Sequence, residues 1–511
     1  MKNISQIFSQ RQAGDAKPLF IFEMANNHMG DVNHGLKIIR DVHSVSKDFD
    51  FNFAFKFQYR DLDTFIHPDY KDRMDLKYIK RFSETRLKEE EFLTLKNEVE
   101  KLGFISICTP FDEASVEKIV KHNYDIIKIA SASFTDWPLL EKIVSCDKPI
   151  IASTGGVKIE NIDKVVNFFS HRNKQFAVMH CVGQYPTEDG QLQFNQITLL
   201  RDRYPEITIG FSTHERPDNF EAVKLAVAKG AGILEKHVSI KTEQYPINAY
   251  SATPDQLRNW LEAARQAYKI CGVVGRRHEF NSAESADIRQ FQRGVFAGRD
   301  IKAGERIDVT NTFFAFPNKD GQILANDMSK YTVLTAQKDF KKNDPIMASE
   351  LSILEVREKV YEVLKKVNEI LKKAGVPISN KWDFELSHHY GLDKFHDIGA
   401  SIVSCFNREY CKKLIVMLPG QKHPTHTHKL KEETFHVLWG DVTFGVGSNK
   451  QTCGPGDILT IERGCNHDFE SNGGCVFEEI STTHYKNDSF YEDQDIINNP
   501  NRKTILTYWV I

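Results

Sequence analysis

Short apolar runs alternate with amphipathic stretches along the first 275 residues of the chain. Strands that are apolar along their length, with helices between them, are typical of a parallel sheet covered on both faces. Eight such units in about 250 residues predict a (β/α)8 TIM barrel over residues 1–280. The eight runs begin at Pro18, Phe51, Gly103, Ile126, Pro149, Gln175, Ile207 and Gly232.

The C-terminal ends of these runs carry side chains able to do acid–base, phosphate or metal chemistry. They read EMANNH, KFQ, TPF, KIAS, STG, HC, STH and EKH. Each residue has a structural alternative; a serine after a strand, for example, can cap the next helix. In a TIM barrel, however, all strand ends meet on one rim, where active sites lie. The convergence of eight polar ends therefore predicts an active site.

The rest of the chain has a different pattern. Residues 285–354 contain two similar strand-turn units, which predict a small β-rich domain. Residues 355–378 have apolar positions at helical spacing and end near Gly375 and Pro377, which predicts a linker helix. Residues 380–511 consist of short strands with Gly and Asn turns, typical of an all-β jelly-roll barrel.

Composition narrows the class of protein. The chain has 511 residues, and its 67 Lys and Arg against 70 Asp and Glu leave a net charge of −3. This balance gives no general reason to bind nucleic acid or anionic membrane, so any affinity for an anion must come from a local site. No signal-peptide run or apolar span of about 18 residues occurs. Nine cysteines without a CxxC pair indicate free thiols, and we expect a cytoplasmic protein.

The strand-end motifs carry a resemblance to a known family. FEMANNHMGD, FKFQ, TPFD, KIAS, STGG, HCVGQYPT, GFSTHE and ILEKH stand in the order seen in sialic acid (N-acetylneuraminate) synthases. The resemblance covers residues 18–355 and includes an antifreeze-like (SAF) domain at 285–354. It implies that C3 of phosphoenolpyruvate adds to an aldose, N-acetylmannosamine or a related sugar, and that phosphate is released. It also implies a homodimer, in which the small domain closes the partner's barrel.

The resemblance implies roles for individual residues. A trianionic substrate needs cations and fixed donors. Glu23 is the candidate for proton transfer; Asn27 and His28 hold the sugar or order the loop, and Tyr185 lines the pocket. His214 and His237 are implied ligands of Mn²⁺ or Mg²⁺, and two imidazoles favour Mn²⁺. The implied substrate-binding residues are Lys56, Gln58, Thr109, Lys128, Ser131, Ser153 and Ser212.

Three departures from the family concern the sugar side of the site. Ser133 stands where the family usually carries an acidic residue. Phe314–Pro317 replaces a segment with an Arg before Pro, and Tyr245–Asn248 replaces a Gly-Pro-Asp stretch. The sequence therefore does not identify N-acetylmannosamine as the acceptor sugar, and another aldose is an alternative.

Residues 420–440, GQKHPTHTHKLKEETFHVLWG, fit the cupin metal-binding pattern. Alternate strand residues face the same way, so His426 and His428 point together into the barrel. With Glu433 and His467 they form a set that suits Mn, Fe, Ni or Zn. The structural alternative is a cupin that keeps these residues for stability alone. We expect the flanking His423 and His436 to lie in solvent or in packing.

The cupin segment also resembles D-lyxose/mannose isomerases, which interconvert an aldose and its ketose. YGLDKFHDIG, KEETFHVLWGDV and FEEISTTH carry this resemblance, and Lys431 and Glu479 match polar active-site positions. Three hypotheses follow. The cupin makes or binds the sugar that the barrel condenses; or it is a non-catalytic sugar-sensing module beside an active synthase; or the whole chain is a carbohydrate-binding scaffold without activity.

Overall fold

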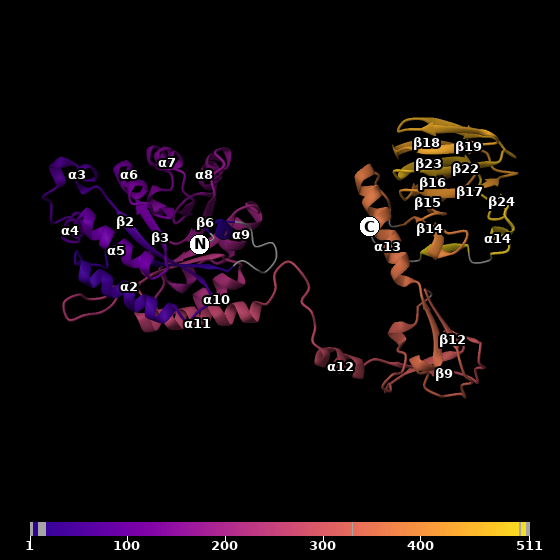
Figure 1. Ribbon diagram of the computed structural model, residues 1–511, viewed down its shortest axis with the longest axis horizontal. Helices are drawn as coiled ribbons and strands as arrows, with labels where there is room; N and C mark the ends of the chain where they lie inside the picture. The colour runs from indigo at the N-terminus through magenta and orange to yellow at the C-terminus, as the bar shows by residue number, and fades with distance from the viewer. Residues whose placement is uncertain (1–3, 9–16, 330, 380, 500–501, 507–511) are drawn as a thin grey trace. The chain divides into compact units, whose positions relative to one another are not determined.

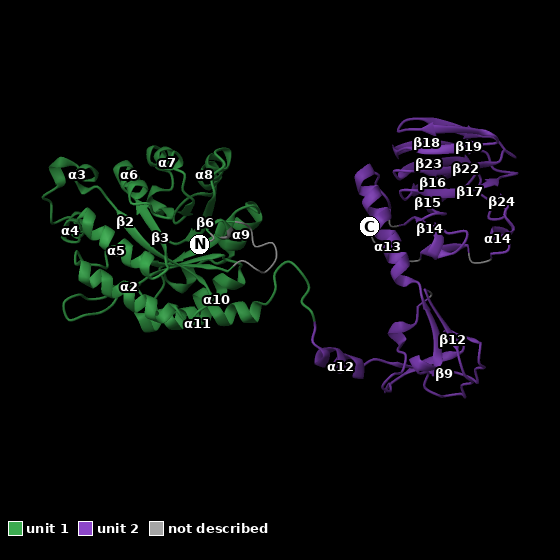
Figure 2. Ribbon diagram, in the orientation of Figure 1, with its two compact units in different colours: residues 1–279 green, residues 280–511 purple. Residues whose placement is uncertain are grey.

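Eight parallel strands close into a barrel, which confirms the predicted TIM-barrel class. The computed structural model describes residues 4–8, 17–329, 331–379, 381–499 and 502–506 (Figure 1). Figure 2 shows its two compact units, Met1–Glu279 and Phe280–Ile511. The barrel strands are β1 Leu19–Glu23, β2 Asn52–Tyr59, β3 Ile105–Pro110, β4 Ile126–Ile129, β5 Ile150–Ser153, β6 Phe176–Cys181, β7 Thr208–Thr213 and β8 Ile233–His237.

Amphipathic helices follow the strands and surround the barrel (Figure 1). In α8, for example, Ile162, Val165, Val166 and Phe169 are buried at helical spacing. No described helix is long and apolar enough to cross a bilayer. The helices are α1 Ser5–Phe8, α2 Val32–Ser46, α3 Leu62–Phe65, α4 Lys77–Glu84, α5 Glu89–Lys101, α6 Glu113–Lys121, α7 Trp137–Val144, α8 Ile159–His171, α9 Asn195–Arg203, α10 Glu221–Ala228 and α11 Pro254–Cys271, with 3-10 turns η1 Pro68–Tyr70, η2 Ser131–Ser133 and η3 Asp189–Gln191.

The barrel interior changes from apolar to polar along the strands. Leu19 and Ile21 belong to a buried apolar cluster that also holds Ile7 and Phe8 of α1. Because alternate residues of a strand share a face, Glu23 follows Ile21 on the inward side. The register places Glu23 level with Lys56 of β2 and with His237 of β8. The C-terminal layer of the barrel is therefore a ring of polar side chains.

Strand β8 shows the same alternation. Glu235 and His237 face the interior with Ile233, whereas the residue between them points to the other side. On this outer side, the ammonium of Lys236 lies 2.7 Å from the carboxylate of Glu215, and both side chains are no more than 1% exposed. One strand thus supplies two inward polar groups and one outward ion pair.

The second unit begins with a small β-rich region. Its core includes Val295, Ile323, Leu334, Phe340 and Ile346. Strands β10, β12 and β13 form one antiparallel sheet, and β9 pairs with β11. The elements are α12 Ser282–Gln290, β9 Gly294–Ala297, β10 Arg306–Ile307, β11 Thr312–Ala315, η4 Ala325–Asp327, β12 Thr332–Ala336, η5 Ala348–Glu350 and β13 Leu351–Glu355.

Helix α13, Arg357–Ala374, precedes the last region and ends at Gly375, whose φ of 64° is left-handed. The helix was predicted as a linker, but its apolar face packs in one core with the sheet residues Leu414 and Val416.

Two antiparallel sheets, of seven and five strands, make up the all-β region that the sequence predicted. Its elements are β14 Asp383–Ser387, η6 Leu392–Lys394, β15 Ala400–Asn407, β16 Tyr410–Met417, β17 Gln421–Thr427, β18 Glu433–Gly440, β19 Val442–Val446, β20 Asn449–Cys453, β21 Ile458–Ile461, β22 His467–Ser471, β23 Cys475–Thr482, β24 Phe490–Tyr491, α14 Gln494–Ile497 and β25 Lys503–Leu506.

Candidate functional site

Charged side chains from four strands meet at the C-terminal end of the barrel. Glu235 lies between two lysines: its carboxylate oxygens are 2.8 Å from Nζ of Lys56 and 3.5 Å from Nζ of Lys128. Ser212 donates to the same carboxylate at 3.2 Å, and Lys56 also forms an ion pair with Glu23. The four charged side chains are at most 5% exposed. Burying charge at this density is costly, so the cluster points to a function.

Burial and neighbouring charges set the protonation states of this cluster. Burial lowers the pKa of Lys56 to about 8. Burial alone would raise the pKa of Glu235, but Lys128 and Lys56 together hold it below its usual range. Glu235 therefore stays ionised and keeps two ammonium groups close together, where an incoming polyanion meets both.

Hydroxyl and amide groups surround the lysines. Nζ of Lys128 lies 2.5 Å from Oγ of Ser153, and the amide of Gly155 donates to Oγ of Ser131 at 2.9 Å. Oγ1 of Thr109 is buried without a hydrogen-bond partner among the described residues. Ser153 does not cap a helix, because α8 begins at Ile159. The donors named from the sequence are thus available around the cations.

Glu23 is the second carboxylate of the centre. Besides its ion pair with Lys56, it accepts from Nε2 of Gln58 at 3.4 Å. The amide of Ala25 also donates to it. A carboxylate held on three sides at the barrel mouth is well placed to exchange a proton with a bound substrate.

The two predicted metal-binding histidines lie side by side. The ring centroids of His214 and His237 are 5.3 Å apart, and both rings are buried. Nδ1 of His214 lies 2.8 Å from the carbonyl oxygen of Val182, which leaves its Nε2 free. Burial lowers the pKa of His214 to about 4 and that of His237 below its usual range. Neutral imidazoles with free nitrogens suit a divalent metal, with substrate or water completing the coordination.

Aromatic rings cover this histidine pair. The ring of Tyr185 lies 4.0 Å from His214, and that of Tyr250 lies 5.1 Å from His237, centroid to centroid. Tyr185 was expected to line the pocket, but Tyr250 was not identified from the sequence. It lies in the long loop after β8, whose course no local pattern defines.

The loop residues Asn27 and His28 are engaged in holding loops together. Nδ2 of Asn27 donates to the carbonyl of Val238 at 2.9 Å and to Ser251 at 3.0 Å, and its Oδ1 accepts from Asn248. His28 is buried, and its Nδ1 accepts from the amide of Gly30. Of the two roles named from the sequence, these contacts match ordering of the loop. Ser133 is likewise buried, in the turn η2.

Glu235 is the main residue that sequence reasoning missed. Its neighbour His237 was selected, and a carboxylate two positions earlier on the same strand must share its face. The alternation of side chains along the strand was therefore the signal that could have identified Glu235 as a site residue.

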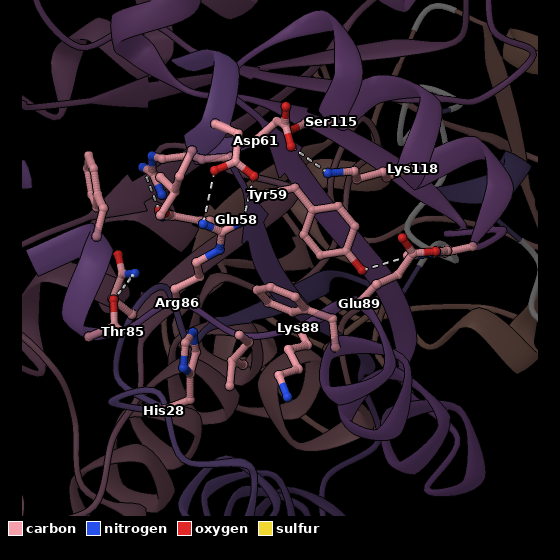
Figure 3. Close-up of a pocket in the computed structure, with 18 residues that line it drawn as sticks. His28, Gln58, Tyr59, Asp61, Thr85, Arg86, Lys88, Glu89, Ser115 and Lys118 are labelled. Carbon is pink, nitrogen blue, oxygen red and sulfur yellow. Dashed lines mark hydrogen bonds and ion pairs between the residues drawn. The ribbon is translucent and has the colours of Figure 1, made fainter. Parts of the chain in front are cut away.

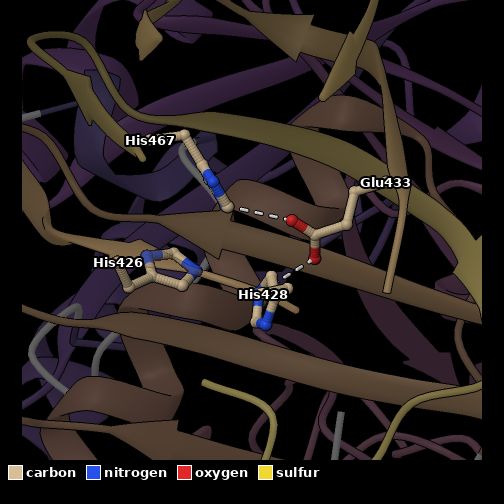
Figure 4. Close-up of side chains that lie close together, drawn as sticks. All are labelled: His426, His428, Glu433 and His467. Carbon is tan, nitrogen blue, oxygen red and sulfur yellow. Dashed lines mark ion pairs between the residues drawn. The ribbon is translucent and has the colours of Figure 1, made fainter. Parts of the chain in front are cut away.

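A second polar cluster lies in the cupin region. It consists of four buried side chains, and one ligand atom of each lies within 4.8 Å of the others (Figure 4). These are His426 of β17, His428 directly after that strand, Glu433 of β18 and His467 of β22. Nε2 of His467 and Oε2 of Glu433 are 3.0 Å apart, and Nε2 of His428 is 3.5 Å from Oε1. Oε2 of Glu433 and Nε2 of His467 have no hydrogen-bond partner among the described residues, which is consistent with a cation held between them.

Backbone carbonyls fix the three imidazoles. Nδ1 of His426 lies 3.1 Å from the oxygen of Pro424, and Nδ1 of His467 lies 3.1 Å from that of Cys465. Nδ1 of His428 contacts the carbonyl of Asp488. A carbonyl can only accept, so each Nδ1 carries the proton and each Nε2 presents a lone pair. Burial also lowers the pKa of His426 and His428. The set therefore fits a divalent transition metal.

Two lysines and a carboxylate adjoin this set. Nζ of Lys431 lies 2.9 Å from Glu479 and forms an ion pair with Glu433, while Nζ of Lys413 lies 2.9 Å from the same Glu479 oxygen. Burial opposes the charge of Lys431, but Glu479 and Glu433 raise its pKa above the usual range. Lys431 and Glu479 were identified from the sequence, whereas Lys413 was not.

The remaining cupin histidines lie outside the ligand set. His423 is buried and stacks on Phe469, with ring centroids 4.4 Å apart. Nδ1 of His436 lies 3.6 Å from Glu478.

Comparison with known proteins matches three parts of the chain. Residues 52–276 match the NeuB family, residues 292–352 the SAF domain and residues 413–480 the cupin domain. N,N'-diacetyllegionaminic acid synthase of Campylobacter jejuni is 27% identical over 342 residues, 65% of this chain and 99% of that protein. An uncharacterized protein of Methanocaldococcus jannaschii is 32% identical over 312 residues, 60% of this chain and 88% of that protein.

A solved structure extends this likeness to three dimensions. A crystal structure described as spore coat polysaccharide biosynthesis protein E from Chromobacterium violaceum is 52% identical, with a TM-score of 0.64. It covers 66% of this chain, and this chain covers all of it. The closed barrel, the ordered strand-end residues and these likenesses lead to one assignment. The chain belongs to the NeuB family, with a SAF domain and a cupin domain after its barrel.

Proposed function

We propose that the barrel is a nonulosonate (3-deoxy-ulosonate) synthase that condenses phosphoenolpyruvate with an aldose and releases phosphate. The observation that carries the proposal is the pair of buried ammonium groups of Lys56 and Lys128, held together by Glu235. The phosphate and carboxylate of phosphoenolpyruvate require such cations and gain strong charge-assisted hydrogen bonds from them. The legionaminic acid synthase among the relatives supports this reaction class.

The residues divide the reaction between them. Lys56, Lys128 and the hydroxyls of Ser131, Ser153 and Ser212 bind phosphoenolpyruvate, with Thr109 as a further donor. C3 of phosphoenolpyruvate forms a bond to the aldehyde carbon, whose oxygen takes a proton. Water then adds at C2, and the bond from C2 to the phosphate oxygen breaks to release phosphate.

The acceptor binds on the other side of the centre. A divalent metal, when held by His214 and His237, supplies Lewis-acid polarisation of the aldehyde. Glu23, beside Lys56 and Gln58, exchanges the proton at the condensing centre. Tyr185 lines the pocket, and Asn27 and His28 hold the loop that shapes it.

Release of inorganic phosphate tests this proposal. The whole protein is incubated with phosphoenolpyruvate, Mn²⁺ or Mg²⁺, and a panel of aldoses that includes N-acetylmannosamine. We expect release that requires both a metal and an acceptor. Absence of release with every aldose would reject the synthase. Any acceptor-dependent release excludes the reading of the chain as an inactive scaffold.

We also propose that the cupin centre acts on the same sugar, as an aldose–ketose isomerase. The Lys431–Glu479–Lys413 network beside Glu433 supports this reading, because isomerisation needs a metal next to groups that move a proton. A cupin that only binds the sugar is the competing reading. Incubation of the protein with a ketose, followed by analysis for the aldose, distinguishes the two.

Two further proposals concern assembly and metals. The SAF domain supports a homodimer, which a mass measurement at micromolar concentration tests. Mn²⁺ or Mg²⁺ is proposed for the barrel, and Mn, Fe, Ni or Zn for the cupin.

A further inference from the structure

A cavity of about 280 Å³ opens beside the proposed reaction centre, at the C-terminal end of β2 and next to α5 and α6 (Figure 3). Gln58 connects the two spaces. Its Nε2 lies 3.4 Å from Glu23, and its Oε1 accepts from Nη2 of Arg60 at 3.0 Å. His28 lines the same cavity. The cavity is therefore an outward continuation of the centre, and the condensation step itself leaves it unused.

The carboxylates that line this cavity are already neutralised by cations. Each one lies within hydrogen-bond distance of a lysine or an arginine, so none of them is left to balance a further positive charge. The pairs are Asp61–Lys118 at 2.8 Å, Asp63–Arg86 at 2.8 Å and Glu89–Lys121 at 2.6 Å.

Arg60 differs from these cations. Its guanidinium carbon lies 4.2 Å from the ring centroid of Phe82 and 3.6 Å from that of Phe111, so two rings hold its plane. Its Nε is buried without a hydrogen-bond partner, and no carboxylate of the described chain lies within ion-pair distance. Burial and the charge of Arg81 lower its pKa to about 10, against a weaker attraction from Asp112. Arg60 is thus a positive charge without a matching anion.

We propose that this cavity holds the end of the acceptor sugar remote from its aldehyde, and that the acceptor carries there an anionic group that pairs with Arg60. A carboxylate and a phosphate ester share the required chemistry, because the guanidinium fork binds either one through two parallel hydrogen bonds. The side-chain amide of Gln58 contacts both Glu23 and Arg60. We therefore expect an open-chain sugar with its aldehyde at the centre to reach Arg60. The inference rests on the proposed synthase activity, which makes the aldehyde the reacting end of the sugar.

Binding of unreactive sugar analogues tests the inference without turnover. The Mn²⁺-loaded protein is first saturated with phosphoenolpyruvate, so that the Lys56–Lys128 site is filled. Calorimetry then compares a neutral hexitol with its 6-phosphate and with the C6 carboxylate obtained by reducing the corresponding hexuronate at C1, which all lack an aldehyde. We expect one or both anionic analogues to bind about tenfold more tightly or better, and the two arms show which anion is preferred. Equal affinity for neutral and anionic analogues in the wild-type protein would overturn the inference.

Variants assign the effect to Arg60. Arg60→Met should remove the preference for the anion, and Arg60→Lys, which keeps the charge but not the fork, should lose most of it. If Arg60→Met does not fold, Arg60→Lys alone carries the test. Arg73→Met is the matched control, because Arg73 is an exposed arginine of the same segment, paired with Asp75 at 2.6 Å outside the cavity. A preference that survives in both Arg60 variants, or falls equally in the control, contradicts the inference.

The two proposals fail in different ways. If anionic hexitols bind through Arg60 but no aldose supports phosphate release, the synthase proposal is wrong and the anion site stands. If neutral aldoses react and the hexitols bind equally, the synthase stands and the anion site is wrong.

Discussion

The barrel site and the cupin site use the same kinds of side chains but pair them differently. In the barrel, Glu235 binds two lysines, and neither imidazole of the neighbouring pair forms an ion pair with a carboxylate of the described residues. In the cupin, Glu433 lies among three imidazoles, and the adjacent Glu479 binds the lysines. The barrel carboxylate is thus placed between two lysines, whereas the cupin carboxylate is placed among imidazoles, with one lysine beside it.

This difference leads to an expectation for how each proposed site would bind a metal. All three cupin imidazoles are fixed by backbone carbonyls, so the ligand set is complete within the protein. In the barrel, only His214 has such a bond, and Nδ1 of His237 has no partner among the described residues. We expect the cupin to hold its metal before sugar arrives, and the barrel to bind its metal together with substrate.

The largest effect is expected from His237→Ala. Loss of one of the two proposed protein ligands should lower phosphate release by about 10³-fold or more, comparable to loss of a key electrostatic donor. Steady-state release measures the effect, and an unchanged melting temperature shows that the fold is intact. Full activity of the EDTA-treated wild-type protein would show that the barrel needs no metal.

The second expected effect separates the two sites by substrate. With a ketose and phosphoenolpyruvate, the His426→Ala/His428→Ala double variant should lose phosphate release by more than about 100-fold, because loss of direct ligands exceeds the effect of outer partners. With the corresponding aldose it should match the wild type, since the barrel is intact. Equal rates with both sugars in the double variant would show that the cupin is not an upstream isomerase.

A third, graded effect concerns pH. The pKa of Lys56 is about 8, so this lysine is charged below that pH and neutral above it. We expect kcat/KM for phosphoenolpyruvate to fall by up to about tenfold per pH unit above that value. Lys56→Arg keeps the charge at high pH and should flatten this alkaline limb. A wild-type profile that stays flat to pH 10 would contradict the assignment of Lys56 as a binding cation.

The smallest effect concerns metal content. After dialysis without chelator, we expect about one equivalent of transition metal per chain, retained by the cupin. His426→Ala should abolish this retention, whereas His237→Ala should leave it unchanged, as elemental analysis of the three proteins would show. Loss of the retained metal in the His237→Ala variant would instead show that the barrel, and not the cupin, retains the metal.

The sequence predicted much of both sites, because strand periodicity constrains them. The ends of parallel strands meet on one rim, so Lys56 and Lys128, which are 72 positions apart in the numbering, could be grouped without coordinates. A different rule, alternation along one strand, grouped His426 with His428 in the cupin. The contacts of Tyr250 and Asn248 could not be predicted, because long loops take their course from tertiary packing. The unpaired charge of Arg60 could not be predicted either, because it depends on the nearby carboxylates forming ion pairs with other lysines and arginines.

The alternation along β8 has a consequence for variation in this chain. Glu235 holds the two lysines proposed to bind substrate, His237 belongs to the proposed metal-binding pair, and the outward Lys236 is paired with Glu215. Insertion or deletion of a single residue within this strand would exchange the two faces. An ammonium group would then enter the centre while a carboxylate and an imidazole left it. We therefore expect functional variants of this chain to keep the length of β8 and to vary in length in the loops on either side of it.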